Sequence, residues 1–194
     1  PDWLEGLWKK TPWGKALSYY SILDFGDQIK EISPFYIWGC NFSIRKPILQ
    51  KMEGFHPDGM PKEHILYRGD GETAVSQFVK NRGYKSLYHP KASVYHLVST
   101  QRMTIEYLEW RAFSQGISDS YTQIRALGGV FNKSVRLKNK LRQLLKLTNL
   151  YAWHNNEING SIYKGYWKGF FSHQQAVQND KNLLEWVLKP NYLN

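Results

Sequence analysis

The sequence has a single cysteine, Cys40, and no long run of apolar residues. One cysteine cannot form an internal disulfide, which fits a protein kept in a reducing compartment. No stretch approaches the roughly 18 consecutive apolar residues of a membrane-spanning helix, and no charged-then-apolar leader opens the sequence. The sequence therefore predicts a soluble protein, and Pro1 in place of an initiator methionine indicates a processed product or a piece of a longer protein.

Acidic residues are scarce in the last part of the sequence. Residues 134–194 carry nine Lys and Arg against three Asp and Glu, a net charge of +6, whereas the residues before them carry +4. Such a basic surface suits nucleic acid, an anionic membrane or a phosphorylated ligand, and charge alone does not choose among them. At 194 residues, 42% of them hydrophobic, the chain can bury the core of one domain, with or without an appendage.

Hydrophobic periodicity predicts an α/β chain that ends in helices. Strand-like composition covers residues 34–46, 84–89 and 92–98. Helical patterns cover residues 2–8, 47–53, 72–81, 105–116, 134–147, 159–177 and 182–190. Between the first helix and residue 28 we expect irregular structure, and Gly165 and Gly169, four residues apart, predict a close approach by a neighbouring element.

Two carboxylates, Asp70 and Glu72, stand on the glycine-rich turn "RGDGET" just before a helical pattern. Acidic residues at this position stabilise a helix by facing the positive end of its dipole, so helix capping alone accounts for them. Capping does not require a glycine on each side of Asp70, however. The two glycines indicate a backbone with unusual dihedral angles or one that another group approaches closely.

The segments "GCNFSIRKPILQKMEGFHPD", "GDGET" and "GYKSLYHPKASVYH", in this order and spacing, resemble the C-terminal half of an inverting family 2 glycosyltransferase of the GT-A fold. The resemblance covers about residues 38–116. It implies a partial GT-A-type mixed sheet with flanking helices over residues 1–130, followed by a basic helical extension over residues 131–194. The family's Asp-x-Asp metal motif and its nucleotide-binding half are not found in this sequence, so the resemblance implies that both lie outside it.

The resemblance also implies a role for individual residues. Glu72 takes the position of the catalytic base, Asp70 is its neighbour, and His96 takes that of a histidine that helps to hold the metal or the donor pyrophosphate. A further set would contact the substrates through the glycine-containing loop or through positive charge. This set is Trp38, Gly39, Asn41, Arg45, Arg68 and Arg102.

These residue types suit the chemistry of sugar transfer. A carboxylate can take the proton of an acceptor hydroxyl as that hydroxyl attacks the sugar. A divalent metal, Mn or Mg, would stabilise the leaving diphosphate and would be held mainly by residues outside this chain. Without the resemblance, His96 is an ordinary core or strand-end histidine, Asn41 satisfies a bend, Trp38 belongs to a core and the arginines are solvated.

The sequence thus predicts a glycosyltransferase, or a fragment of one that is inactive alone. It would move a sugar from a nucleotide-sugar donor to a glycan or lipid-linked acceptor with inversion, in bacterial envelope polysaccharide synthesis. We expect it in the cytoplasm, with peripheral contact to the inner face of the membrane through its basic helices. Two alternatives stay open: a non-catalytic module that binds an anionic partner, with nucleic acid disfavoured, and a metal-dependent hydrolase with Asp70, Glu72 and His96 as ligands.

Overall fold

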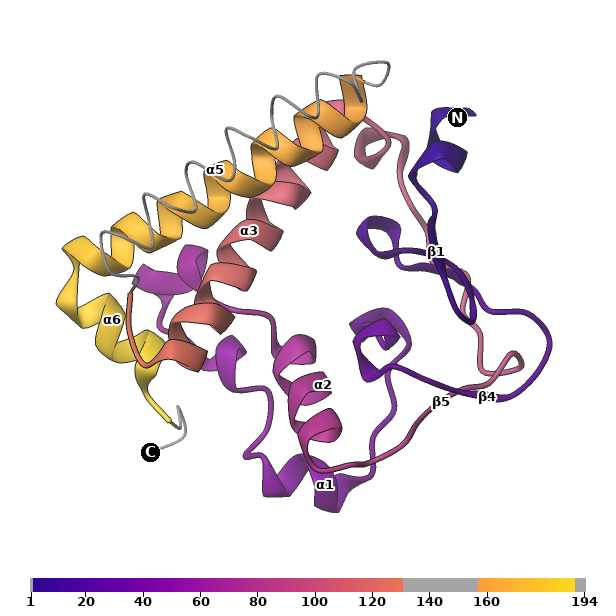
Figure 1. The fold of residues 1–194 in the computed structure, drawn as a ribbon, viewed down its shortest axis with the longest axis horizontal. Coiled ribbons are helices and arrows are strands. Elements are labelled where there is room, and N and C mark those ends of the chain that lie inside the picture. Colours follow the sequence, from indigo (N-terminus) through magenta and orange to yellow (C-terminus); the bar gives the residue numbers. More distant parts are fainter. Residues whose placement is uncertain (1, 131–156, 191–194) are drawn as a thin grey trace. The chain divides into compact units, whose positions relative to one another are not determined.

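The computed structural model describes residues 2–130 and 157–190, and this part of the chain forms two compact units (Figure 1). One unit, which we call the sheet unit, contains residues 2–59 and 70–99. The other, the helical unit, contains residues 60–69, 100–130 and 157–190. A boundary at residue 130 therefore does not coincide with the division between the compact units. Whether it marks the end of a catalytic domain stays a prediction.

Two small antiparallel sheets give the sheet unit its name. The strands are β1 (Lys9–Thr11), β2 (Gly14–Leu17), β3 (Ile22–Asp24), β4 (Lys30–Ile32) and β5 (Ser86–Tyr88). The first three pair in sequence order, and β4 pairs with β5. The hydroxyl of Thr11 accepts hydrogen bonds from the backbone N–H groups of Trp13 and Gly14, 3.1 Å each, and so closes the turn between β1 and β2.

Aromatic side chains fill the space beside these short strands. The buried core consists of Ala16, Phe25 and Ile32. The ring of Phe25 meets the edge of Tyr36 at a centroid distance of 5.5 Å and lies 5.4 Å from the ring of Tyr88. These ring contacts join three segments: the residue after β3, the turn of residues 34–36, and β5.

Two short helices complete the sheet unit: α1 (Lys46–Lys51) and α2 (Gly71–Asn81). Pro47 lies at the start of α1, where its missing N–H is not needed. The hydroxyl of Ser76 in α2 donates a hydrogen bond of 2.9 Å to the carbonyl of Pro34. This bond fixes α2 to the turn of residues 34–36.

Three helices build the helical unit: α3 (Ile105–Leu127), α5 (Glu157–Asn179) and α6 (Lys181–Leu188). The first two run side by side in the same direction (Figure 1). Thr104 caps α3 by accepting a hydrogen bond of 3.1 Å from the N–H of Tyr107. Asp180 caps α6 in the same way through the N–H of Leu183, at 3.1 Å.

Glycines let α3 and α5 pack with their backbones in contact. A Cβ atom at Gly165 would overlap the backbone oxygen of Glu109, and one at Gly169 would overlap that of Phe113. Gly116 of α3 meets the backbone of Tyr166 in the same manner. The close approach that the spacing of Gly165 and Gly169 predicts is thus confirmed.

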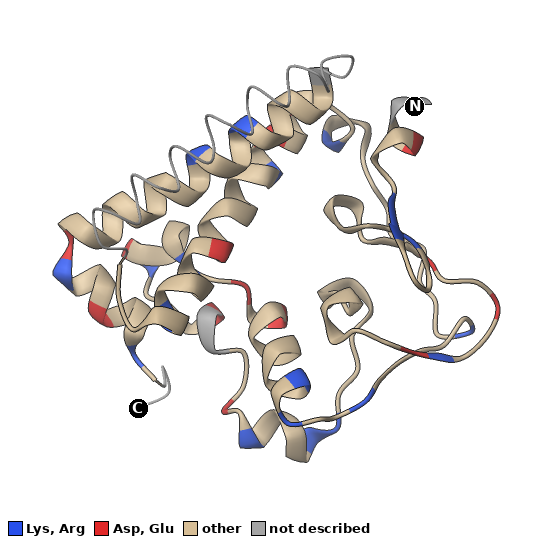
Figure 2. Cartoon of the chain, in the orientation of Figure 1, with Lys and Arg blue, Asp and Glu red and all other residues tan. Residues whose placement is uncertain are grey.

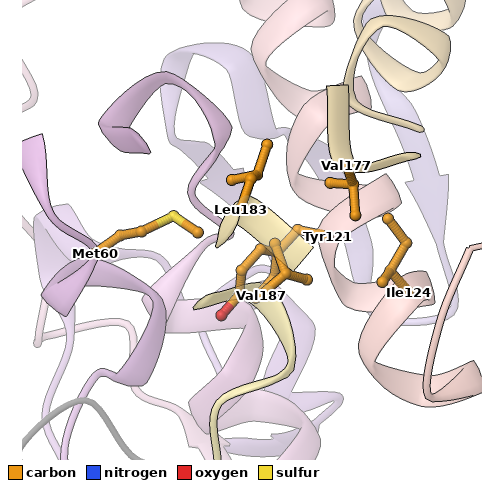
Figure 3. Packing of buried hydrophobic residues seen from close by; sticks show 6 residues of the cluster. All are labelled: Met60, Tyr121, Ile124, Val177, Leu183 and Val187. Carbon is orange, nitrogen blue, oxygen red and sulfur yellow. The ribbon is translucent and has the colours of Figure 1, made fainter. Parts of the chain in front are cut away.

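The core of the helical unit lies where α3, α5 and α6 meet, and Met60 closes one side of it (Figure 3). Its buried members are Met60, Tyr121, Ile124, Val177, Leu183 and Val187. The guanidinium of Arg125 donates hydrogen bonds to the carbonyls of Val187 and Lys189, at 2.7 and 2.8 Å, and so holds the end of α6 against α3.

The mixed α/β class and the helical C-terminal part are confirmed by the structure, with helices close to the predicted bounds in both units. The predicted helix over residues 105–116 continues to Leu127, because Gly116 is a packing position and the C-terminal glycine is Gly128, with φ of +67°. The predicted basic helix over residues 134–147 lies outside the described residues. In the described ranges no helix has both the length and the hydropathy that a membrane crossing needs.

The predicted strand over residues 84–89 is confirmed as β5, but the other two predicted strands and the irregular region are wrong. The expected irregular region after residue 8 contains the three-stranded sheet. The expected strand over residues 34–46 consists instead of single helical turns at residues 34–36 and 39–41, joined by extended links. Residues 92–98 have no strand pairing within the described part of the chain. All strand pairs in the described ranges are antiparallel, so the expected mixed sheet is not found in them.

Candidate functional site

The candidate site lies at the start of α2, where Asp70 is the N-cap residue. One oxygen of its carboxylate accepts a hydrogen bond from the N–H of Glu72 at 3.0 Å, and the other accepts one from the hydroxyl of Thr73 at 2.7 Å. Asp70 thus satisfies backbone groups that no residue within the helix can reach. The capping role that position alone suggests for Asp70 is therefore real.

The carboxyl groups of Asp70 and Glu72 also share a hydrogen bond. This bond, together with burial and the negative charges of Asp70 and Asp58, raises the pKa of Glu72 to about 7. Burial alone would raise the pKa of Asp70 as well, but hydrogen bonds from Glu72 and Thr73 outweigh it and lower that pKa. The pair therefore holds one proton, mainly on Glu72, until the pH approaches neutrality.

The glycine of "WGCN" lies directly against the Glu72 carboxyl. A Cβ atom at Gly39 would overlap Oε1 of Glu72 and would lie 3.2 Å from its Cδ. Gly39 begins a single helical turn that ends at Asn41. The side-chain amide of Asn41 donates a hydrogen bond of 2.6 Å to the carbonyl of Ala92, which ties this turn to the residues that follow β5.

The glycines on either side of Asp70 are explained by close packing and not by unusual dihedral angles, since neither has a positive φ. A Cβ atom at Gly71 would overlap an oxygen of Asp58, within the sheet unit. One at Gly69 would overlap the ring of Tyr121, within the helical unit. Asp58 thus lies against the start of α2, close to Asp70 and Glu72. Figure 2 marks the acidic positions along the chain in red.

His96 has its own surroundings in the sheet unit. Its Nδ1 lies 2.9 Å from the backbone oxygen of Tyr20. Because a carbonyl only accepts, Nδ1 donates this hydrogen bond. Within the described ranges no group of three or more His, Cys, Asp and Glu side chains is placed to hold a metal ion. The structure thus gives no ligand cluster of Asp70, Glu72 and His96.

The remaining predicted substrate contacts fall in different places. Trp38 packs against the aromatic core of the sheet unit, and Arg45 is exposed just before α1. Arg68 and Arg102 belong to the helical unit, so the structure does not place them at the Glu72 carboxyl. The Nε of Arg102 donates a hydrogen bond of 2.7 Å to the hydroxyl of Tyr107.

The sequence did not indicate two titratable residues, Asp58 and His173, that have distinctive surroundings in the structure. Asp58 adds negative charge near Glu72, and the sequence shows it only as part of the turn "GFHPDG". In the helical unit the fully buried His173 contacts the hydroxyl of Ser120 through Nδ1, at 2.8 Å, and the carbonyl of Tyr67 through Nε2, at 3.1 Å. Its spacing of four residues from Gly169 is the signal that places it on the contact face of α5.

No protein-family model, curated protein or solved structure matches the chain in comparisons with known proteins. Arguments about its function therefore start from the carboxyl pair and the turn that packs on it.

Proposed function

We propose that this chain is the acceptor-side part of an inverting glycosyltransferase of GT-A type, in which Glu72 takes the proton from the acceptor hydroxyl. The observation that carries the proposal is the contact between Gly39 and the Glu72 carboxyl. The resemblance assigns the glycine-containing loop and the acidic motif to one site, although they are far apart in the sequence. Their contact supports that assignment, because capping a helix does not require a glycine loop against the carboxyl.

The shared proton supports Glu72 as the base. A general base works best when its pKa is close to the working pH, and the pKa of Glu72 is about 7. Asp70 is the weaker candidate, since the groups that donate hydrogen bonds to it lower its pKa and so its basicity. Two carboxyls in contact whose pKa values are driven apart are typical of acid–base sites.

In the proposed reaction Glu72 accepts the hydroxyl proton while the hydroxyl oxygen forms a bond to the anomeric carbon from the side opposite the leaving group. The bond to the nucleoside diphosphate breaks, and its electron pair leaves with the phosphate. A divalent cation, when bound, would stabilise that charge. His96 could supply one imidazole ligand, but the described residues contain no group of three or more side chains placed to bind a metal ion. Most ligands of such an ion would therefore come from outside this chain.

The same proposal includes the substrates of the reaction and its place in the cell. The donor would be a nucleotide sugar and the acceptor a glycan or lipid-linked sugar, with the cytoplasm as the place of transfer. Asn41 ends the turn that Gly39 begins, Trp38 directly precedes it, and these two residues are the proposed contacts to the acceptor. The Asn41 amide already bonds to Ala92, so acceptor binding would have to share or replace that bond.

The test is steady-state sugar transfer by the full-length protein with a panel of nucleotide sugars. We expect Glu72→Gln to lower turnover on the order of 10²–10⁴-fold, because glutamine keeps the size of the side chain but cannot take the proton. Wild-type turnover should rise with pH through about 7 as Glu72 loses its proton. The matched control is Glu106→Gln, since Glu106 holds the same position in the first turn of α3 as Glu72 holds in α2.

Asp70→Asn separates catalysis from capping. Asparagine also caps helices, so this variant should cost less turnover than Glu72→Gln. If Asp70→Asn abolishes transfer while Glu72→Gln retains it, the base is Asp70 and the assignment of Glu72 is wrong. If both variants transfer sugar at the wild-type rate, or if no donor is used at all, the carboxyl pair is only the beginning of a helix.

A further inference from the structure

Residues 93–99, "SVYHLVS", form a segment that has strand-like composition but no strand partner within the described ranges. The side chains of Tyr95 and Leu97 are 103% and 90% exposed, and that of Val94 is 54% exposed. His96 and Val98, between and after them, are partly covered. From Tyr95 to Val98 the exposure alternates as in a strand with one face on the protein and an apolar face toward solvent, whereas Val94, on the same face as His96, is itself exposed.

An exposed segment of this kind invites pairing with another extended chain, since no strand of the described part of the chain pairs with its backbone N–H and C=O groups. A lipid bilayer fits the segment poorly, because an extended backbone that enters hydrocarbon loses its hydrogen bonds to water and gains none. An added strand satisfies the backbone groups and covers the apolar side chains at once.

The order of the residues identifies the strand that fits. Around His96 the segment reads nearly the same in both directions. Ser93 matches Ser99 and Val94 matches Val98, and the two different residues Tyr95 and Leu97 lie one on each side of His96. In an antiparallel pair centred on His96, each residue would face its match. Tyr95 of one strand would then face Leu97 of the other, twice, and aromatic–aliphatic pairs of this kind stabilise sheets.

The charges agree with such a pairing. The chain carries a net charge of +10, so most contacts between two copies would bring cations together. Residues 92–101 contain no charged side chain, and the flanking Lys91 would face Gln101 of the other strand. No like charges would therefore be opposed along this stretch.

We propose that residues 93–99 pair with the same segment of a second copy of this chain. The two strands run antiparallel and a two-fold axis passes between the two His96 residues. The contact is closed, since each copy uses the same surface, and it yields a dimer rather than a filament. This proposal does not rest on the proposed enzymatic function.

The experiment measures the mass of the full-length protein by sedimentation equilibrium over a range of concentrations. Two double variants change the outer face: Tyr95→Lys with Leu97→Lys, and Tyr95→Glu with Leu97→Glu. Each alone should weaken the dimer at least ~10-fold, because residue 95 of one copy then faces a like charge at residue 97 of the other. An equimolar mixture of the two should dimerise again, since each lysine then faces a glutamate.

Ile29, which is 59% exposed in the same unit, supplies the control. Ile29→Lys and Ile29→Glu remove a similar apolar surface outside the segment and should leave the dimer unchanged. Circular dichroism and thermal melting establish that all variants are folded.

Several results would overturn the proposal. They are a wild-type protein that stays monomeric to about 100 μM, a dimer that tolerates both double variants, a mixture that fails to dimerise, and polymers without a defined end. A monomer that binds anionic vesicles through Tyr95 and Leu97 would also overturn it, in favour of a membrane contact.

Discussion

The helical unit and the sheet unit differ in how far their elements depend on one another. In the helical unit α3 and α5 are 23 residues each, satisfy most of their own backbone groups and bury side chains such as Leu108 and Val177 almost completely. In the sheet unit the strands have three or four residues, and large apolar side chains such as Tyr95 remain in solvent. Helices need only one apolar face to be covered, whereas strands also need partners for their backbone. We therefore expect the two units to respond differently to the same change.

The largest difference should be the response to pH. Burial lowers the pKa of His173 from 6.5 to about 4, against a smaller opposite effect of its hydrogen bond to Tyr67. As the pH falls from about 6.5 to about 4, only the unfolded chain takes up this proton. The free energy of unfolding of the helical unit should then fall by on the order of 3 kcal/mol.

The sheet unit should respond in the opposite direction between pH 4.5 and about 7. There the folded state holds a proton on Glu72 that the unfolded chain releases, so this unit loses stability as the pH rises. Urea unfolding at several pH values, followed by limited proteolysis and mass spectrometry of the fragments, reports on each unit. His173→Gln should flatten the response of the helical unit, and a change of the exposed His89 should not. Equal responses in both units would contradict the comparison.

The packing of α3 on α5 should show the next largest effect. Gly169→Ala places a methyl group against the backbone oxygen of Phe113, which forces the helices apart and should cost about 1–3 kcal/mol. Gly160→Ala in the same helix is the control, because nothing lies within 4 Å of its added Cβ. Alanine should stabilise that position by roughly 0.5–1 kcal/mol. Thermal melting of both variants decides whether the glycine contact is as close as described.

The sequence predicts the helical unit better than the sheet unit, and the reason is the length of each pattern. Helices such as α3 and α5 repeat an apolar face over several turns, so their type is clear from one sequence. A three-residue strand such as β1 is too short to show alternation. Tyr36, Ile37 and Trp38 resemble a strand because they fit a core, but they reach that core from a turn and the link after it.

The candidate site was predicted only in part, for a related reason. The cap formed by Asp70 follows from local sequence. The resemblance assigns Gly39 and Glu72 to one site, but their direct contact is seen only in the structure. Asp58 influences Glu72 from a turn that carries no recognisable signal of its own. The partner of His96 is the backbone carbonyl of Tyr20, and a backbone carbonyl leaves no trace in a sequence.

The caps of α2 and α6 allow a smaller and sharper comparison. Asp180→Ala removes a cap from the helical unit and should cost about 1 kcal/mol. Asp70→Ala removes an equivalent cap from the sheet unit but also removes the group that raises the pKa of Glu72. At pH 5 the variant also loses the hydrogen bond that the two carboxyls share, whereas above pH 7 it removes the repulsion between two ionised carboxylates. Asp70→Ala should therefore cost less at pH 8 than at pH 5, and the cost of Asp180→Ala should stay the same. Denaturant titration of both variants at the two pH values measures these costs, and a cost of Asp70→Ala that does not change with pH would show that the Glu72 pKa is not raised.

The smallest effect is expected for the ion pair between Lys85 and Glu31, whose charged atoms are 3.0 Å apart on the surface of the β4–β5 sheet. Both side chains are largely exposed, so Glu31→Gln should change the free energy of unfolding by less than about 0.5 kcal/mol. The same measurement in 1 M salt is the control, since screening should remove the difference. A larger effect would mean that this sheet depends on charge and not on the ring of Phe25 against Tyr88.

The glycine contacts between α3 and α5 also restrict how one helix can slide along the other. On α5 the residues at every fourth position of the contact are Ser161, Gly165, Gly169 and His173. A slide of one turn, ~5.4 Å, in one direction would press the imidazole of His173 into the backbone at Phe113, where only glycine fits. The same slide in the other direction would withdraw that imidazole from Ser120 and leave its buried hydroxyl without this partner. His173 therefore opposes an axial slide in both directions, through a steric clash in one and through the loss of a hydrogen bond in the other.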